Sequence, residues 1–243
     1  HHRKPIMARK KHNGFKPVHM TPSIVPPYRE PITALTPTQK VYLKYLARED
    51  QVVAIGPAGT GKTFLPSIMA IDQLLDGKIN KIVVTRPVVG AGGEELGFFP
   101  GSEQEKYGHW TRPVIDAFEQ RAGKHRVNSF LYHGQIELAP LSTMRGRTLD
   151  DSIVLLDEGQ NASWELMKML VTRIGKGTQL FVTGDLRQTD IHGMNGLEIM
   201  TRIIAQQNLP IPIVEFTSKD VVRSELCSLW VKAIELFEGE VSH

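Results

Sequence analysis

Two hydrophobic patterns alternate along the chain. Short continuous apolar runs, each closed by glycine, proline or polar residues, predict buried strands, whereas apolar residues that recur every three or four positions predict helices with one buried face. This alternation is typical of an α/β domain with a mainly parallel central sheet. The predicted strands span residues 52–55, 81–86, 135–140, 153–158, 180–185 and 213–216. The predicted helices span residues 38–48, 64–76, 164–174, 197–207 and 221–238, and a polar, partly helical stretch interrupted by Gly108 and Pro113 spans residues 102–122.

Two segments depart from these patterns. Residues 1–31 are rich in proline and basic side chains, and their first acidic residue is Glu30. We therefore expect a flexible arm at 1–31 ahead of a single domain at 32–243. Residues 90–101 contain too many glycines for regular structure. A loop of that length in a compact domain usually has a function.

The composition is ordinary for a globular domain. Of the 243 residues, 41% are hydrophobic and 23% are charged, which argues against a disordered chain. No apolar run approaches the roughly 20 residues of a membrane span, and the basic start lacks an apolar signal segment, so we expect a cytoplasmic protein without a membrane partner. The single cysteine, Cys227, excludes an internal disulfide, and its apolar neighbours predict that it lies in the core. The net charge of +3 is too small to establish a nucleic-acid partner.

A phosphate-binding loop follows the first predicted strand. The glycines in it allow successive N–H groups to turn toward one anion, and the positive end of the following helix points at the same place. Lys62 would bind the β- and γ-phosphates of a nucleotide, and Thr63 would bind Mg²⁺ through its hydroxyl. Pro66 lies early in that helix and is expected to kink or shorten it. The loop consists of Gly56, Pro57, Ala58, Gly59, Thr60, Gly61, Lys62 and Thr63.

Two carboxylates, Asp157 and Glu158, end the fourth predicted strand. In P-loop enzymes an acidic residue at this place holds Mg²⁺ together with the loop hydroxyl, and a neighbouring base activates the attacking water. We therefore predict Asp157 as a metal ligand with Thr63, and Glu158 as the general base. An acidic pair also suits the first turn of a helix capped at Asn161 or Ser163, so this prediction depends on the phosphate loop.

Several polar side chains are placed near the same predicted edge. Gln39 lies on the first turn of the helix at 38–48, where its amide could pair with adenine, although spacing alone favours an exposed glutamine. Gln188 follows the fifth strand, as a phosphate sensor or as a surface residue. Arg86 ends the second strand, at the edge where open α/β sheets bind ligands. Arg145 and Arg147 belong to a basic connection ahead of the fourth strand.

Taken in order, these motifs resemble those of the first RecA-like domain of superfamily 1 helicases. The chain resembles the PhoH-like family of phosphate-starvation ATPases more closely, over about residues 32–238. The segments at 96–101 and 144–149 are specific to that family. Two residues depart from the family pattern. Gly159 stands where the family usually has alanine, and Ser224, after Arg223, stands where we expect histidine. The resemblance is carried by residues 56–63, 85–87, 96–101, 139–141, 144–149, 157–161, 172–175, 184–188 and 220–223.

The resemblance implies a three-layer RecA-like P-loop NTPase fold, ATP with Mg²⁺ as the bound nucleotide, and RNA or single-stranded nucleic acid as the substrate class. It implies that Gln39 contacts adenine, that Gln188 senses the γ-phosphate and that Arg86 contacts nucleic acid. Arg145 and Arg147, near a strand end, are further candidate nucleic-acid contacts.

The chain has room for one RecA-like domain, whereas a superfamily 1 helicase closes its ATP site with an arginine from a second one. We therefore expect a neighbouring copy to supply an arginine in trans, within a head-to-tail ring, and a hexamer is the first expectation. Because Arg223 is one candidate for this arginine, we include it among the predicted catalytic residues. The other candidates for the arginine in trans are Arg145, Arg147 and Arg187.

The expected function is ATP hydrolysis coupled to binding, remodelling or unwinding of RNA or single-stranded nucleic acid. The alternative is a nucleotide-gated RNA-binding scaffold or chaperone in which hydrolysis resets binding without translocation, and the single motor domain favours it. A small-molecule kinase is disfavoured because Glu158 suits activation of water and no lid-like basic segment is evident. A nuclease has no support because the sequence shows no second acidic metal cluster.

Overall fold

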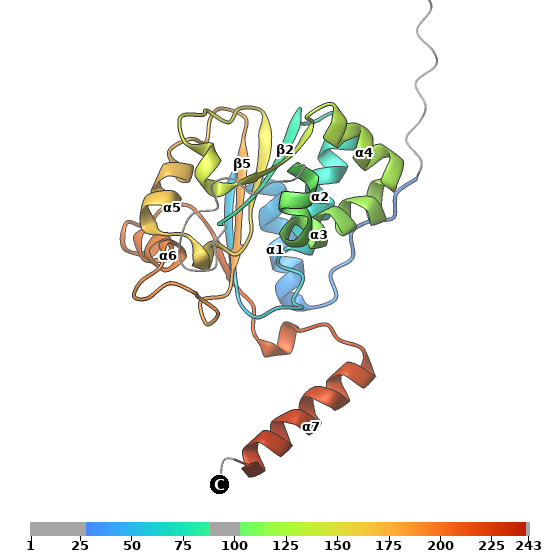
Figure 1. Cartoon of the computed structure of the whole chain (residues 1–243), viewed down its shortest axis with the longest axis vertical. Coiled ribbons are helices and arrows are strands. Elements are labelled where there is room, and N and C mark those ends of the chain that lie inside the picture. Colours follow the sequence, from blue (N-terminus) through green and yellow to red (C-terminus); the bar gives the residue numbers. More distant parts are fainter. Residues whose placement is uncertain (1–27, 88–102, 242–243) are drawn as a thin grey trace, which may run out of the picture.

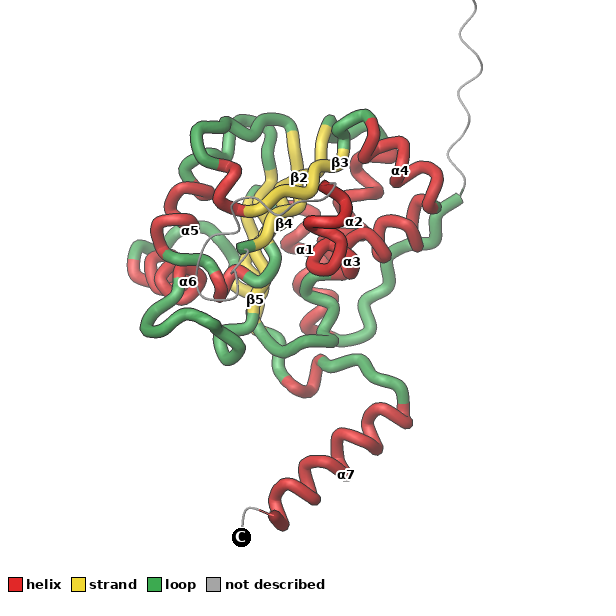
Figure 2. The backbone as a smooth tube through the Cα atoms, viewed as in Figure 1, coloured by secondary structure: helices red, strands yellow, loops and turns green. Residues whose placement is uncertain are grey.

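Six parallel strands form one sheet in the computed structural model, which describes residues 28–87 and 103–241 (Figures 1 and 2). Their order across the sheet is β3-β2-β4-β5-β1-β6, and each neighbouring pair is parallel. The six predicted strands are therefore confirmed. The predicted arm up to residue 27 and the predicted loop at 90–101 lie outside the described residues. The strands are β1 (Gln51–Ile55), β2 (Lys81–Arg86), β3 (Ile136–Pro140), β4 (Ser152–Leu156), β5 (Gln179–Gly184) and β6 (Ile213–Glu215).

Helices cover both faces of the sheet, which gives the molecule three layers. The helices α1 (Pro37–Arg48), α2 (Phe64–Leu75), α3 (Glu103–Ala122) and α4 (Lys124–Tyr132) cover one face, and α5 (Trp164–Val171) and α6 (Gly196–Gln206) cover the other (Figure 1). Along β1, Val52 and Ala54 join the core on the α1 side, and Val53 joins the core on the α5 side. Because the strands are buried on both faces, they appear in the sequence as continuous apolar runs.

Two helices on the α1 side differ from the sequence prediction. α3 continues through Gly108 and Pro113 instead of being interrupted there. Pro113 lies on the exposed side of α3, where water can bond the carbonyl that the missing N–H leaves unpaired, while Val114 and Phe118 hold the helix in the core. α4 was not predicted, because Val127 is its one buried residue and leaves no apolar periodicity.

Pro66 does not shorten α2, which spans 12 residues, whereas the alternative effect, a kink, stays a prediction. Proline is tolerated in the first turn of a helix because the N–H groups there have few intrahelical partners. The carbonyl of Lys62, which a residue other than proline at 66 would bond, accepts a hydrogen bond from the hydroxyl of Tyr42 at 2.9 Å. A side chain of α1 thus supplies the donor that Pro66 lacks.

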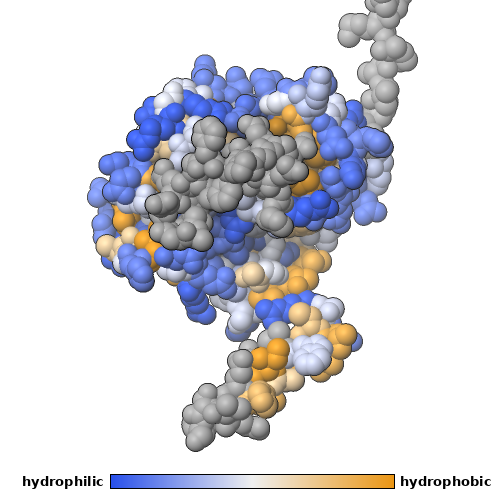
Figure 3. Space-filling view, viewed as in Figure 1, coloured by the Kyte–Doolittle hydropathy of each residue, from blue (hydrophilic) through white to orange (hydrophobic). Residues whose placement is uncertain are grey.

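The last helix, α7 (Glu225–Val241), leaves the domain instead of closing it (Figures 1 and 2). Leu226, Leu229 and Trp230 are 63 to 66% exposed, and hydrophobic side chains gather on α7 in Figure 3. The prediction that Cys227 lies in the core is wrong, because Cys227 is exposed. Apolar spacing identifies a face that can be buried, and it does not show what covers that face. Among the helices of the described residues, none is long and apolar enough to cross a lipid bilayer.

Candidate nucleotide-binding site

The strand order brings the phosphate loop and the acidic pair to one edge of the sheet. β5 separates β1, which leads into the loop, from β4, which leads into Asp157. Because the strands are parallel, their carboxyl ends share that edge. The hydroxyl of Thr63 donates a hydrogen bond to Oδ1 of Asp157 at 2.9 Å. The two residues that were predicted to share a metal ion are therefore in contact.

The loop itself curls around its own backbone. Gly59 and Gly61 have φ values of +78° and +84°, which a residue with a Cβ rarely adopts. The ammonium group of Lys62 donates to the carbonyl of Pro57 at 3.2 Å, so this side chain folds back across the loop. The hydroxyl of Thr60 donates to the same carbonyl at 3.1 Å. An anion bound by the loop can therefore replace this carbonyl as the partner of Lys62.

The two ends of the loop are fixed to neighbouring elements. The N–H of Gly56 donates to the carbonyl of Gly184 at the end of β5, at 3.1 Å. Ala58 lies exposed at the tip of the loop. At the other end, the N–H of Leu65 donates to the carbonyl of Gly61 at 2.9 Å, which begins the helical bonding of α2. The loop is thus a rigid link between the sheet and the N-terminus of α2.

Helix α1 supports the loop from behind. Gln39 is buried, its amide nitrogen donates to the carbonyl of Thr60 at 2.9 Å, and its amide oxygen accepts from the N–H of Leu35 at 2.7 Å. Burial raises the pKa of Tyr42 and the charge of Asp157 raises it further, so the hydroxyl remains a donor to the loop backbone. Gln39 therefore positions the loop in this structure. Its contact with adenine, implied by the resemblance, stays a prediction.

The residues around Asp157 have the chemistry and the spacing of a Mg²⁺ site. Asp157 is buried, and its Oδ1 accepts hydrogen bonds from Thr63 at 2.9 Å and from Thr183 at 2.7 Å. Mg²⁺ prefers octahedral oxygen ligands at about 2.0–2.1 Å, so two neighbouring ligands lie about 2.9 Å apart. The oxygens of Thr63 and Asp157 have that separation. These two oxygens would hold a Mg²⁺ ion if one were bound here.

Glu158 is held in a strained conformation beside Asp157. Its φ and ψ are 54° and 40°, in the left-handed region that residues with a Cβ seldom occupy. Oε1 lies 3.4 Å from a guanidinium nitrogen of Arg86, and Oε2 accepts a hydrogen bond from the amide of Gln160. Both carboxylate oxygens of the predicted general base are therefore engaged by neighbouring residues.

Gln160 is a site residue that the sequence reasoning missed. It is fully buried, and its amide oxygen accepts from the N–H of Asp185 at 3.0 Å while its nitrogen bonds Glu158. The hydroxyl of Thr189 donates to the carbonyl of Gln160 at 2.9 Å. The turn after Asp157 and Glu158 is therefore tied to the loop that follows β5. The sequence signal was a polar residue two positions after Glu158, which has no meaning without the fold.

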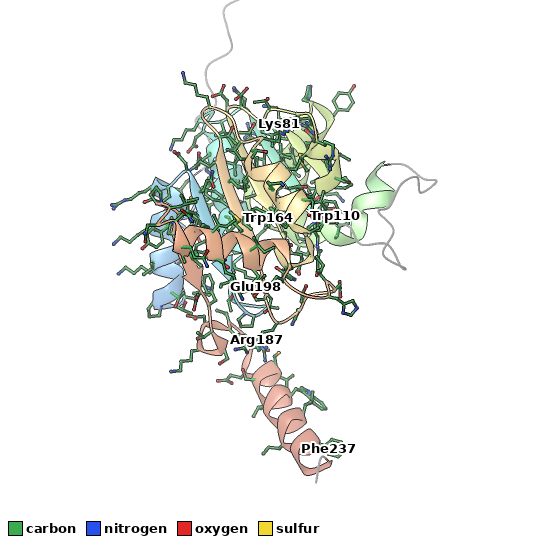
Figure 4. The ribbon with its side chains drawn as sticks, turned by 90° about the vertical axis from the view of Figure 1, so that its left-hand side faces the viewer. Lys81, Trp110, Trp164, Arg187, Glu198 and Phe237 are labelled. Carbon is green, nitrogen blue, oxygen red and sulfur yellow. The ribbon has the colours of Figure 1, made fainter. Side chains whose placement is uncertain are left out.

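Gln188 and Arg223, both predicted catalytic residues, are exposed. Within the described part of the chain their side chains make no hydrogen bond or ion pair, so their roles stay predictions. Arg223 follows Val222, whose N–H donates to the carbonyl of Gly59 at 2.9 Å. The backbone that leads into α7 therefore crosses the phosphate loop. In Figure 4, Arg187 lies at the end of the domain from which α7 departs.

The three arginines predicted to contact nucleic acid differ in their surroundings. Arg86 forms the ion pair with Glu158 that is described above. Arg147 donates to both carboxylate oxygens of Glu137, at 2.5 and 2.9 Å. These bonds lower the pKa of Glu137 to about 2. Lys81 lowers it as well, whereas partial burial acts in the opposite direction. Arg147 is thus paired within the chain, and its role as a nucleic-acid contact stays a prediction. Arg145 is exposed and has no side-chain partner among the described residues.

Comparison with known proteins identifies the family to which the chain belongs. Residues 31–235 match the model of the PhoH-like protein family. A PhoH-like protein of Bacillus subtilis (strain 168) is 41% identical over 206 residues, which are 84% of this chain and 64% of that protein. Protein PhoH of Escherichia coli (strain K12) is 38% identical over 201 residues, covering 81% of this chain and 56% of that protein. The chain thus spans about 56 to 64% of the length of these relatives.

A similarity in structure agrees with the topology. The large terminase from a thermophilic bacteriophage matches with a TM-score of 0.50 and 13% identity, over 78% of this chain and 48% of that chain. At that identity the match concerns the fold alone, which is that of a P-loop NTPase. The family match covers the phosphate loop, the acidic pair and the sheet that joins them. The chain belongs to the PhoH-like protein family.

Proposed function

We propose that this protein hydrolyses ATP in the presence of Mg²⁺ and couples hydrolysis to binding of RNA or single-stranded nucleic acid. The contact between Thr63 and Asp157, at 2.9 Å beside Lys62, carries this proposal. Lys62 binds the β- and γ-phosphates after leaving the carbonyl of Pro57. Thr63 and Asp157 would hold Mg²⁺, which would neutralise charge that develops on the phosphates. Glu158 accepts the proton of the attacking water.

The base of the nucleotide has a suitable groove next to the loop. An open groove of about 380 Å³ is lined by Tyr28, Ile32 and Phe64 among other residues. Phe64 directly follows Thr63 and is 43% exposed. An aromatic ring at this position offers a face for a purine. Phe64→Ala is therefore expected to raise KM for ATP several-fold without an equal loss of kcat.

Lys62→Ala tests nucleotide binding, with Lys124→Ala as the control. Lys124 is exposed and makes no ion pair within the described residues, so its loss changes the net charge but not the site. A hydrogen bond to a charged group contributes about 1.5–3 kcal/mol, so Lys62→Ala should weaken ATP binding at least about tenfold. Titration calorimetry with Mg-ATP measures this. Equal affinity of the two variants would overturn the proposed site.

Nucleic acid is proposed to bind at the same edge of the sheet. Arg86 ends β2 at this edge, and exposed Arg145 adds a second cation after β3. Loss of one phosphate contact reduces the slope of the logarithm of the binding constant against the logarithm of the salt concentration by about one unit. Arg145→Gln should show this change with labelled single-stranded RNA, whereas Arg126→Gln on α4 should not. ATP-dependent strand displacement supports a motor, and ATPase activity without displacement supports the scaffold.

A second copy of this chain is the proposed partner of α7. Leu229, Trp230 and Phe237 of α7 are each 63 to 67% exposed in a single copy of the chain. The sequence of α7 contains four glutamates and one lysine, whereas α1 carries Lys40, Lys44 and Arg48 at four-residue spacing with no acidic residue. None of these three cations makes an ion pair among the described residues. The opposite charges favour α7 of one copy lying along α1 of the next, as a head-to-tail ring requires.

A further inference from the structure

We propose that Arg86 holds Glu158 inactive in the resting protein and releases it when a phosphodiester group of a nucleic acid takes the guanidinium. This inference rests on the proposed function and adds a mechanism that couples the two ligands. It makes Arg86 a positioning residue that acts on the reaction through Glu158. The coupling follows because the N–H group of Arg86 that faces Glu158 cannot bond a phosphate oxygen at the same time.

The sheet places the two groups side by side. β2 and β4 are neighbours with Thr85 opposite Leu156, so Arg86, the last residue of β2, and Glu158, two residues after β4, lie at the carboxyl ends of paired strands. The N–H of Asp157 donates to the carbonyl of Thr85 at 3.0 Å, which extends this pairing to the acidic residues. A guanidinium nitrogen of Arg86 then lies 3.4 Å from Oε1 of Glu158.

In this state Glu158 is poorly arranged to act as a base. A general base needs an oxygen directed at the water whose proton it accepts. Gln160 bonds Oε2, and Arg86 lies beside Oε1, so each oxygen is directed at a donor of the chain instead of at a water. Departure of one of the two donors frees an oxygen of Glu158 to turn toward a water.

Arg86 is the donor that can leave. Gln160 is fully buried and is fixed at its other end by the N–H of Asp185 at 3.0 Å. The side chain of Arg86 is 26% exposed, and its hydrogen bond to the carbonyl of Trp110 is long at 3.4 Å. A guanidinium binds a phosphate with two parallel hydrogen bonds, which are stronger than this single long contact with a carboxylate. The exchange is thus favourable when a phosphate comes within reach.

Two sources could supply that phosphate oxygen, a nucleic-acid backbone and the γ-phosphate of ATP itself. We assign the nucleic-acid backbone, because exposed Arg145 provides a second cation after β3, whereas the phosphates of ATP already have Lys62 and the loop. ATPase assays with and without single-stranded RNA separate the two sources. Release by ATP alone predicts a fast basal rate that RNA does not raise, and that result would overturn the inference.

The kinetic test uses Arg86→Gln, with Arg126→Gln on the exposed surface of α4 as a matched loss of charge. Arg86→Gln should raise basal kcat about five- to tenfold, leave KM for ATP unchanged and abolish stimulation by a 20-nucleotide oligouridine, since site couplings are commonly about 5- to 150-fold. Arg86→Lys keeps the charge and should restore part of the stimulation. A basal kcat in Arg86→Gln equal to or below that of wild type contradicts the inference.

A binding test needs no turnover, because coupling between two sites is reciprocal. Without its charge, Glu158 no longer competes for Arg86, so Glu158→Gln without nucleotide should bind the labelled oligouridine about fivefold more tightly than wild type. Glu165→Gln, which removes an exposed charge on α5, controls for net charge and should change the affinity less than twofold. Equal affinity of Glu158→Gln and Glu165→Gln contradicts the inference. A wild-type protein that binds no ATP would overturn the proposed function itself. The two assays distinguish that failure from a failure of the inference about Arg86 alone.

Discussion

Tyr42 and Pro66 are far apart in the sequence, yet together they complete one hydrogen bond of the phosphate loop. Pro66 cannot donate to the carbonyl of Lys62, and the buried hydroxyl of Tyr42 donates instead, at 2.9 Å. A buried carbonyl without a donor destabilises a fold by about 1–3 kcal/mol. At the residue scale, the site therefore depends on side chains that bond the backbone of the loop and never need to touch the nucleotide.

Tyr42→Phe tests this dependence. The free energy of unfolding of this variant should be about 1–3 kcal/mol lower than that of wild type, because the carbonyl of Lys62 loses its donor. For the same reason the variant should bind ATP more weakly. Pro66→Ala restores an N–H one turn after that carbonyl, so the double variant Tyr42→Phe/Pro66→Ala should recover part of the loss. Urea denaturation of wild type, the two single variants and the double variant gives the coupling free energy between Tyr42 and Pro66. Losses that simply add would show that the hydroxyl does not serve this carbonyl.

Glu137 gives a second test at the residue scale, through pH. Arg147 and Lys81 lower its pKa from 4.5 to about 2, so the charged form stabilises the fold above pH 4.5 and this contribution disappears as the pH falls toward 2. Glu137→Gln should therefore cost about 1 kcal/mol of unfolding free energy at pH 7, and this cost should shrink as the pH falls from 4.5 through about 2. Asp116→Asn, in an exposed pair with Arg112, is the control and should change little. A cost that does not vary with pH would exclude the ion pair as its cause.

At the scale of elements, the sequence predicted what local pattern determines. Buried parallel strands are continuous apolar runs, so β1 to β6 were found, and with them the place of Asp157 at the end of β4. Contacts between elements were not found. Gln160 reaches Glu158 and Asp185 at once because β4 and β5 are neighbours, and no spacing in the sequence shows that. α4 was missed because it buries a single residue.

Gln160→Leu tests the link between the turn after β4 and the loop after β5. Leucine has a similar volume but leaves the N–H of Asp185 without its partner and Glu158 without a fixed position. We expect kcat for ATP to fall about tenfold or more while KM changes less, since the effect is on orientation and not on phosphate binding. Steady-state phosphate release measures both constants. A rise in KM with normal kcat would assign Gln160 to nucleotide binding instead.

At the scale of the whole molecule, α7 is the element that a single chain leaves unexplained. The large apolar side chains described on it are 47 to 70% exposed, and the backbone before it crosses the phosphate loop at Gly59. A helix placed in this way can join assembly to nucleotide binding, because Val222 lies on the loop and Leu229 on the exposed face. The ring expected from the sequence stays a proposal that α7 makes testable.

Leu229→Glu/Trp230→Glu should convert an assembled protein to a smaller species if α7 binds a second copy, because two charges replace apolar contacts. Light scattering after size exclusion, with and without Mg-ATP, measures the mass. Lys40→Glu/Lys44→Glu on α1 should weaken assembly in the same way if the two helices meet. A wild-type monomer that hydrolyses ATP rapidly would refute both the ring and the arginine supplied in trans.

The central claim is that Lys62, Thr63, Asp157 and Glu158 act on one triphosphate, and Glu158→Gln tests it most directly. Its amide cannot accept the proton of water, but it leaves the phosphate loop and the metal ligands in place. Titration calorimetry and phosphate release on the same preparation measure binding and turnover. The account predicts an affinity for Mg-ATP within about twofold of wild type and a kcat at least about 100-fold lower. Turnover at the wild-type rate would contradict it.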